Sequence, residues 1–479
     1  MMHNNAVNFP KTQRVFGVLA AALFMAWPAF YNRYPLLYPD STSYLAAGSV
    51  VGRAVLFHQF SDYYGDRSLI YGLGILPFHW NITPWPIVFL NAVLTAYVLW
   101  LTARSLLQRR PQAGYWSLVM LLSLFTGLGW IVGRIMPDVL GPVLYLSIYL
   151  IVFSWDALSR AERVALLLIA WWAITSHATH LLLAGALCVL LVPVLMLQRE
   201  PARRWLRAVG RPALIVMAAV ATQLALNAYL YGKPSLNGRR PPFLLAHIIA
   251  DGPGRLYLHS RCGVHHFAIC DKVQALPDNT DDFLWTENGI WQTASEDQQQ
   301  RMIEEEMPVV LGALRAYPRE ELVISAGNFW QQLHTFGLED YDPSPWIAKT
   351  LDTGLPGAGA RYARSRQAQE TLNTDFFTSV QEWTVTASLL VICVWSLLLR
   401  QNRSSRLIGF AAVIAFSVLA NAAVTGVLSN VEDRYQARVI WLVPLLAGVL
   451  VLTWLDQRAS SERVPGQCPA TKSHGRSER

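Results

Sequence analysis

Charged residues are scarce in this chain. Of its 479 residues only 15% are charged, while 53% are hydrophobic. A soluble globular chain carries about 25% charged residues, so most of this chain has to be solvated by lipid. The net charge of +7 does not indicate a nucleic-acid partner, because the basic residues lie in short loops between apolar runs. The composition predicts an all-α polytopic membrane protein in contact with the bilayer.

Several common catalytic motifs are also missing. The sequence contains no P-loop, no His-Glu-x-x-His and no Gly-x-Ser-x-Gly, which weakens the case for ATP-driven and common hydrolytic mechanisms. No repeat of fixed period is visible, which excludes a solenoid. The chain has only five cysteines, and Cys262 and Cys270 are the two that share a polar region. If that region is extracytoplasmic, the pair either forms a structural disulfide or stays reduced.

Apolar runs long enough to cross a bilayer occur about ten times, within a range of nine to twelve. The first has a basic flank and no small-residue cleavage site, so we expect a retained helix. A further apolar stretch, 69–80, is broken by glycine and proline, which predicts a re-entrant or interfacial segment. The expected spans are 15–31, 84–102, 114–133, 138–154, 163–176, 179–197, 212–231, 383–399, 407–428 and 438–455.

Loop charge predicts the orientation. With a cytoplasmic N-terminus, arginines gather in alternate short loops, as the positive-inside rule requires. We therefore expect a multi-pass protein of a bacterial inner membrane with both termini in the cytoplasm. The predicted cytoplasmic arginines are Arg104, Arg109, Arg110, Arg160, Arg163, Arg199, Arg203, Arg204, Arg207, Arg211, Arg400, Arg403 and Arg406.

The expected topology divides the chain into four parts. They are seven spans in 1–231 with an outward loop and interfacial helix in 32–83, an extracytoplasmic and mainly helical segment at 232–382, three spans in 383–456, and a disordered polar cytoplasmic tail at 457–479. Within the extracytoplasmic segment, 318–336 has one apolar face. This pattern suits an interfacial helix and equally a core helix of a soluble domain.

Polar residues mark the predicted outward ends of the spans. Asp40, just beyond the first helix, is placed to cap a helix and also to act as a general base toward an acceptor hydroxyl; both roles can hold, because a cap fixes the carboxylate in place. Asp138 follows a proline, which is ordinary helix-start chemistry, but together with Asp40 it is also able to hold a divalent cation or an acceptor. A metal cofactor therefore stays open.

Two further clusters lie on the same predicted side. His177 and His180 are either simple turn residues or contacts to a ligand or phosphate, and their spacing alone does not make a metal site. Arg434 and Arg438 are one helical turn apart, so they either fork onto a phosphate or end a solvated helix with charge pairs to residues such as Glu432.

The layout and short motifs resemble the GT-C superfamily of membrane glycosyltransferases, which includes protein O-mannosyltransferases and the aminoarabinose transferase of lipid A. The resemblance rests on "YPDSTSY" with Asp40, "RIMPD" with Asp138, and "RYQAR" before the last helix. The chain departs from the pattern because its large outward segment lies between helices seven and eight rather than mainly at the C-terminus.

The resemblance implies a polyprenyl-phosphate sugar donor and a lipid, glycan or protein acceptor. Asp40 would deprotonate the acceptor in an inverting transfer, while Arg434 and Arg438 steady the leaving phosphate, so that metal need not take part. The implied catalytic residues are Asp40 and Asp138. The implied substrate-binding residues are Tyr44, Arg134, His177, His180, Glu432, Arg434, Tyr435 and Arg438.

Two other classes remain open. A transporter or flippase needs polar groups at mid-membrane, and only Asn91, Gln223, Asn227 and Asn421 lie well inside the expected spans. This scarcity argues against ion coupling. A non-enzymatic membrane component of lipid or surface-polysaccharide export would share the topology of a transferase.

Overall fold

The computed structural model describes residues 11–60, 67–107, 110–199, 201–236, 238, 240–398 and 404–461. Several predicted features lie outside this part of the chain, namely Arg109, Arg400, Arg403 and nearly all of the 457–479 tail. The described residues form helices and no strand, apart from a single bridge between Leu36 and Arg134. The all-α prediction is therefore confirmed for the part of the chain that the structure describes.

Every predicted span coincides with one helix or with a helix pair. Six helices in the described residues are long and apolar enough to cross a membrane, so the number of ten spans remains a prediction. The helices are α1 (Lys11–Met25), α2 (Trp27–Asn32), α5 (Trp85–Leu106), α6 (Pro111–Phe125), α7 (Leu128–Val132), α8 (Leu140–Phe153), α9 (Arg160–Ser176), α10 (Ala178–Leu197), α11 (Ala202–Tyr231), α20 (Thr374–Leu398), α21 (Ser405–Leu428), α22 (Asp433–Ile440) and α23 (Leu442–Ser461).

Local sequence sets where these helices begin. At the start of α9, Ser159 and Glu162 form a capping box, in which the Glu162 N–H donates to Ser159 Oγ at 3.3 Å and the Ser159 N–H donates to Glu162 Oε2 at 2.8 Å. The same Glu162 carboxylate pairs with Arg104 of α5 at 2.6 Å. One acidic residue thus caps a helix and ties it to its neighbour.

The predicted loop 32–83 contains two helices, α3 (Pro39–Phe57) and α4 (Leu69–His79). They cross closely at Gly48 and Gly72, where a Cβ on Gly48 would lie 2.4 Å from the carbonyl oxygen of Gly72. The apolar stretch 69–80 is therefore a short helix packed on α3. This crossing fixes the start of α3, where Asp40 lies.

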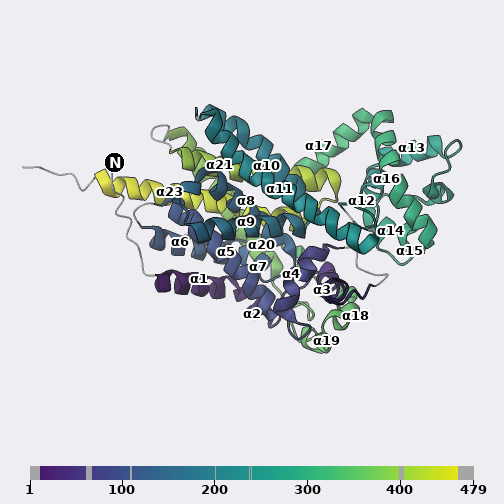
Figure 1. Cartoon of the computed structure of the whole chain (residues 1–479), viewed down its shortest axis with the longest axis horizontal. Helices are drawn as coiled ribbons and strands as arrows, with labels where there is room; N and C mark the ends of the chain where they lie inside the picture. The colour runs from purple at the N-terminus through teal and green to yellow at the C-terminus, as the bar shows by residue number, and fades with distance from the viewer. Residues whose placement is uncertain are drawn as a thin grey trace, which may run out of the picture.

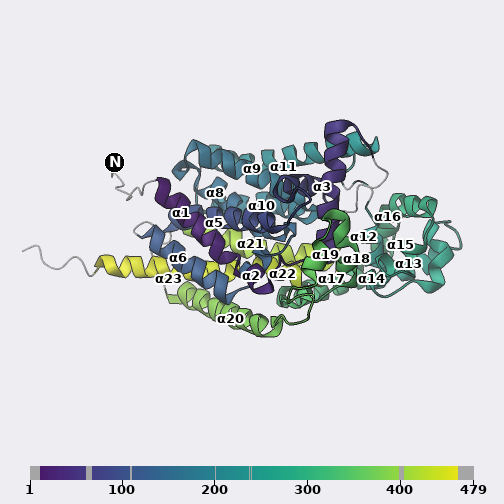
Figure 2. The ribbon, with the colours of Figure 1, turned by 90° about the horizontal axis from the view of Figure 1, so that it is seen from below.

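The first part of the long segment between α11 and α20, from α12 to α16, forms a helical body of its own. The helices α12 to α16 gather beyond one end of the bundle, whereas α1 begins and α23 ends near the opposite end (Figures 1 and 2). They have a core of their own, which includes Leu245, Leu258, Phe283 and Val309. The elements are α12 (Phe243–Asp251), α13 (Pro253–Arg261), η3 (Ala268–Ala275), α14 (Thr280–Leu284), α15 (Ile290–Thr293) and α16 (Glu296–Ala316).

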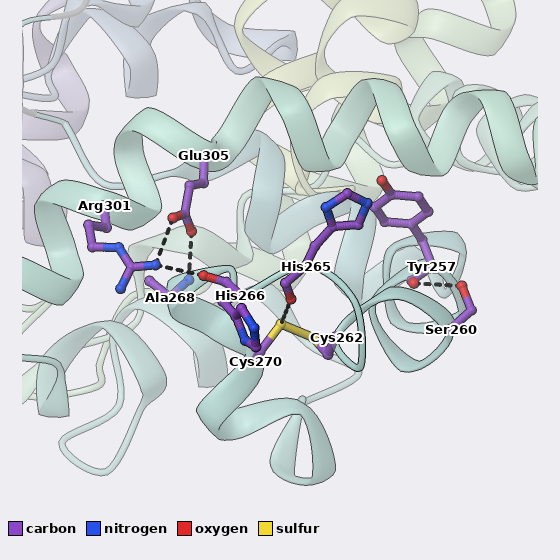
Figure 3. Close-up of a disulfide and its surroundings, with 9 residues drawn as sticks. All are labelled: Tyr257, Ser260, Cys262, His265, His266, Ala268, Cys270, Arg301 and Glu305. Carbon is purple, nitrogen blue, oxygen red and sulfur yellow. Dashed lines mark hydrogen bonds and ion pairs between the residues drawn. A yellow bond between two sulfur atoms is a disulfide. The ribbon is translucent and has the colours of Figure 1, made fainter.

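A disulfide joins Cys262 and Cys270 in this body. It closes the turn between α13 and η3 (Figure 3). Beside it, Glu305 of α16 accepts the Ala268 N–H at 2.6 Å and pairs with Arg301 at 3.1 Å. The turn is therefore held by the disulfide and by the hydrogen bond to the Glu305 carboxylate.

The rest of the segment returns to the bundle. α17 (Pro318–His334) packs along α21, and α18 (Pro345–Gly354) packs on α3, followed by α19 (Ala358–Tyr362). The apolar side chains of α17 that were expected to face either lipid or a core include Leu322 and Val323, which are 70% and 65% exposed. Their exposure favours the interfacial alternative. The next helix, α20, starts at Thr374, before the predicted span start at 383.

Candidate functional site

The predicted outward residues meet at the end of the bundle where α3 and α22 begin. A β-bridge holds this region together, because the Leu36 N–H donates to Gly133 O and the Ile135 N–H donates to Leu36 O, both at 3.0 Å. Two carboxylates, Asp40 and Asp138, each lie between two arginines in this region.

Asp40 lies in the first turn of α3 and contacts guanidinium groups. Its Oδ1 accepts a hydrogen bond from Arg67 at 2.6 Å, and its Oδ2 lies 3.8 Å from Nη1 of Arg434. The prediction that Asp40 caps a helix is wrong, because Tyr38 is the N-cap of α3 and its N–H donates to Ser41 Oγ at 2.9 Å. The Asp40 carboxylate accepts no backbone N–H of α3 and pairs with the two arginines instead.

Asp138 lies in the short 3₁₀ turn η1 (Pro137–Val139) and is buried. Its Oδ1 is 3.2 Å from Arg438, and its Oδ2 is 3.5 Å from Arg134. All three side chains are at most 3% exposed. Both oxygens of this carboxylate are therefore occupied in a dry environment.

Arg438 has no donor facing solvent. Besides Asp138, its guanidinium donates to Asn421 Oδ1 at 2.9 Å and to Thr179 Oγ1 at 3.3 Å, and its side chain is 0% exposed. Arg438 is therefore too buried to bind a phosphate, and of the two arginines predicted to do so only Arg434 stays accessible. Arg438 binds α22 to α21, to the start of α10 and to η1.

Arg434 is the more accessible of the two. Its side chain is 13% exposed and stacks on the rings of Tyr38 and Tyr435, with centroids 4.1 Å and 4.7 Å from the guanidinium carbon. Its backbone N–H donates to Asp340 at 2.7 Å. Its Nε makes no hydrogen bond to any described residue and is itself buried, so a ligand would meet the exposed part of the guanidinium.

The two predicted histidines belong to the same network. Thr179 Oγ1, which accepts from Arg438, lies 2.8 Å from Nδ1 of His177, and that nitrogen accepts the Thr179 N–H. The neutral His177 ring therefore carries its proton on Nε2, and burial lowers its pKa well below the usual value. The His180 ring lies 5.2 Å away, and its Nδ1 donates to Ala173 O at 2.8 Å.

Three more of the predicted residues lie around this network of arginines and carboxylates. Tyr44 is buried with its ring edge-on to Tyr71 at 4.9 Å. Tyr435 receives a hydrogen bond from Arg434 at 3.0 Å. Glu432 is held through its backbone by Gln332 of α17, and burial raises the pKa of its carboxyl to about 7. The structure thus brings all ten predicted site residues to one region.

Sequence reasoning missed Arg67, Asp340 and Tyr341. Arg67 is a lone basic residue in a loop, where no pattern marks it, and it also lies 5.2 Å from the centre of the Trp285 ring. The centre of the Tyr341 ring lies 5.0 Å from the guanidinium carbon of Arg134. Asn421 carried the one usable signal, since it is a polar residue deep inside an apolar run, but its partner Arg438 was not foreseeable.

The site has the chemistry of an anion site. Four arginines, Arg67, Arg134, Arg434 and Arg438, face the carboxylates of Asp40, Asp138 and Asp340, and the carboxyl groups of Asp281 and Glu432 also lie near Arg434. Within the described ranges no group of three or more His, Cys, Asp or Glu side chains is arranged to hold a metal ion. A partly exposed guanidinium, that of Arg434, stacked on aromatic rings favours a phosphate or another anion.

Comparison of the chain with protein-family models, with curated proteins and with solved structures returned no match. Any function assigned to the chain therefore has to rest on the geometry of this site.

Proposed function

We propose that this protein is a membrane glycosyltransferase that moves a sugar from a polyprenyl-phosphate donor to an acceptor hydroxyl on the extracytoplasmic face. The observation that carries the proposal is the 3.8 Å contact between Asp40 and Arg434, because it brings a candidate base and a candidate phosphate ligand into one partly exposed site. The disulfide in the adjoining body supports an extracytoplasmic location, where disulfides persist.

Arg434 would bind the phosphate of the donor. Its planar fork suits phosphate oxygens, and its partial exposure leaves part of the guanidinium open to them. As the bond between the sugar and the phosphate breaks, negative charge grows on the leaving phosphate. A guanidinium held in place by Tyr38 and Tyr435 would stabilise that charge without moving.

Asp40 would act as the general base. Arg67 occupies Oδ1 at 2.6 Å, whereas among the described residues Oδ2 has only the longer contact to Arg434, so Oδ2 is the oxygen placed to take a proton. The acceptor hydroxyl would give its proton to Oδ2 while its oxygen attacks the anomeric carbon. The phosphate would leave from the opposite face, which inverts the configuration.

Asp138 would have a positioning part. Because it is buried between Arg134 and Arg438, it cannot meet a substrate directly, but it fixes the helix start that presents Arg434. The two carboxylates, which the sequence predicts to be catalytic together, would therefore have different roles, with Asp40 as the base and Asp138 as a positioning residue.

The test is a transfer assay on the purified full chain with a panel of polyprenyl-phosphate-linked hexoses and pentoses. Asp40→Asn should lower turnover by about 10² to 10⁴, the usual contribution of a general base, and leave the fold intact. Asp278→Asn is the matched control, because Asp278 is exposed in the adjoining body. Turnover that survives Asp40→Asn would refute the mechanism, and donor binding without transfer by the wild type would favour a non-enzymatic export component.

A further inference from the structure

An apolar groove lies away from the arginine cluster, where α12, α16 and α17 meet the end of α21. Its volume is about 570 Å³, within the range of about 300–1,000 Å³ typical of small-molecule sites. Its apolar walls include Leu244 and Ile248 of α12, Val310 of α16, Ala326 and Phe329 of α17, and Val427 of α21.

The position of the groove points to a hydrocarbon occupant. One wall is the end of α21, a helix long and apolar enough to cross a membrane, and another is α17, which packs along it. α17 also exposes Val323 and Trp330, at 65% and 63%. A helix with large exposed apolar side chains beside the end of a spanning helix is typical of the membrane boundary. The groove therefore opens where lipid chains are available.

One acidic side chain in the groove lacks a partner. Glu321 is only 8% exposed; its Oε1 accepts from Ser325 at 3.1 Å, while its Oε2 is buried without a hydrogen bond to any described residue. Burial raises the pKa of Glu321 above its usual value, and nearby Asp251 acts in the same direction. A buried carboxylate oxygen with no partner costs free energy that a bound donor would recover.

The other charged groups near Glu321 favour a cation. His247 of α12 also lines the groove, but its Nε2 is engaged by the Val427 carbonyl at 2.9 Å and by Asp251 at 3.4 Å. The residues that line the groove include no arginine or lysine. Glu321 is the carboxylate among the lining residues, and nearby Asp251 adds negative charge, which favours a ligand with a positively charged hydrogen-bond donor.

We propose that this groove binds one membrane lipid, with a hydrocarbon chain along the apolar walls and an ammonium head group donating to Glu321. The site is separate from the arginine cluster and does not depend on the transferase proposal. It is connected to that cluster through α17, because Gln332 of the same helix holds both backbone groups of Glu432 at 2.8 Å and 3.0 Å. A bound lipid would therefore brace the helix that fixes the start of α22.

The experiment uses the full chain in phosphatidylcholine vesicles that contain a small fraction of phosphatidylethanolamine with a diazirine on one acyl chain. After photolysis, mass spectrometry should find adducts concentrated in residues 314–329 and 423–428. A matched phosphatidylcholine probe, whose head has no N–H donor, should label these peptides about tenfold less, as expected for one charge-assisted hydrogen bond in a dry site.

Three variants test the two parts of the site. Ala326→Trp fills the groove and should abolish labelling by both probes, whereas Val323→Trp on the exposed face of the same helix should leave it unchanged. Glu321→Gln keeps the shape of the side chain and should bring the ratio between the probes close to one. The proposal would be overturned if labelling were unchanged in Ala326→Trp, or if the ratio between the two probes were unchanged in Glu321→Gln. Thermal melting checks that each variant is folded.

Discussion

Two carboxylates in this protein have the same kind of partner, a pair of arginines, but differ in how far they are exposed to solvent. Asp40 and Asp138 each lie between two arginines, yet the side chains around Asp40 are 13–20% exposed and those around Asp138 are at most 3% exposed. A buried ion pair that loses one partner leaves an uncompensated charge, whereas a partly exposed pair can exchange a partner for water or ligand. The same ion-pair chemistry therefore leaves Asp138 locked between its partners and leaves Asp40 able to exchange a partner for a ligand.

The largest expected effect comes from breaking the buried cluster. Asp138→Asn would leave Arg134 and Arg438 without their shared anion, so the free energy of unfolding should fall by about 3–5 kcal/mol. Thermal unfolding in detergent measures this loss. Asp40→Asn is the matched variant and should cost less than about 1 kcal/mol, since its partners reach solvent. Equal losses for both variants would show that the two sites do not differ in this way.

The second effect concerns ligand affinity. Arg434→Ala should weaken the binding of polyprenyl phosphate by about 1.5–3 kcal/mol, because it removes hydrogen bonds to a charged group. Arg434→Lys should recover part of this loss, since it restores the charge but not the fork. Isothermal titration with polyprenyl phosphate provides the measurement. If affinity is unchanged in Arg434→Ala, the phosphate lies elsewhere.

A smaller effect should come from the ring that holds Arg434. Tyr38→Leu removes the stacking contact of 4.1 Å and should weaken phosphate binding by about 1 kcal/mol, roughly fivefold. Tyr38→Phe keeps the ring and should bind as well as the wild type. A loss in Tyr38→Phe equal to that in Tyr38→Leu would instead assign the contribution to the hydroxyl group.

Much of the fold was predictable because it depends on local patterns. Apolar runs coincide with helices of the bundle, and a Ser/Glu capping box marks where α9 begins. The meeting of the polar clusters was also predictable in outline, because topology places the ends of alternate helices on one side. What the pattern could not supply was the pairing, since Arg438 and Asp138 lie 300 residues apart and meet only through helix packing.

The errors follow from the same limit. A carboxylate in the first turn of a helix favours a cap by local chemistry, yet Asp40 pairs with Arg67 and Arg434, and neither partner is visible from the neighbourhood of Asp40 in the sequence. Arg434 and Arg438 appear equivalent one turn apart, but packing buries one and exposes the other. Burial by distant helices, rather than residue type, decides which arginine can meet a ligand.

The smallest expected effect concerns Glu432, which is partly buried, as Asp40 is. Burial raises its pKa from an ordinary value of 4.5 to about 7, so between these values the folded protein holds a proton that the unfolded chain has lost. Its contribution to stability therefore declines as pH rises from about 4.5 to 7 and is level above that. Because Glu432 is partly in contact with solvent, the decline should amount to less than about 1 kcal/mol. Melting temperatures at pH 5.5 and 8 should show this decline in the wild type and less of it in Glu432→Gln, while Asp278→Asn should behave as the wild type; parallel profiles for wild type and Glu432→Gln would place the carboxyl group in water.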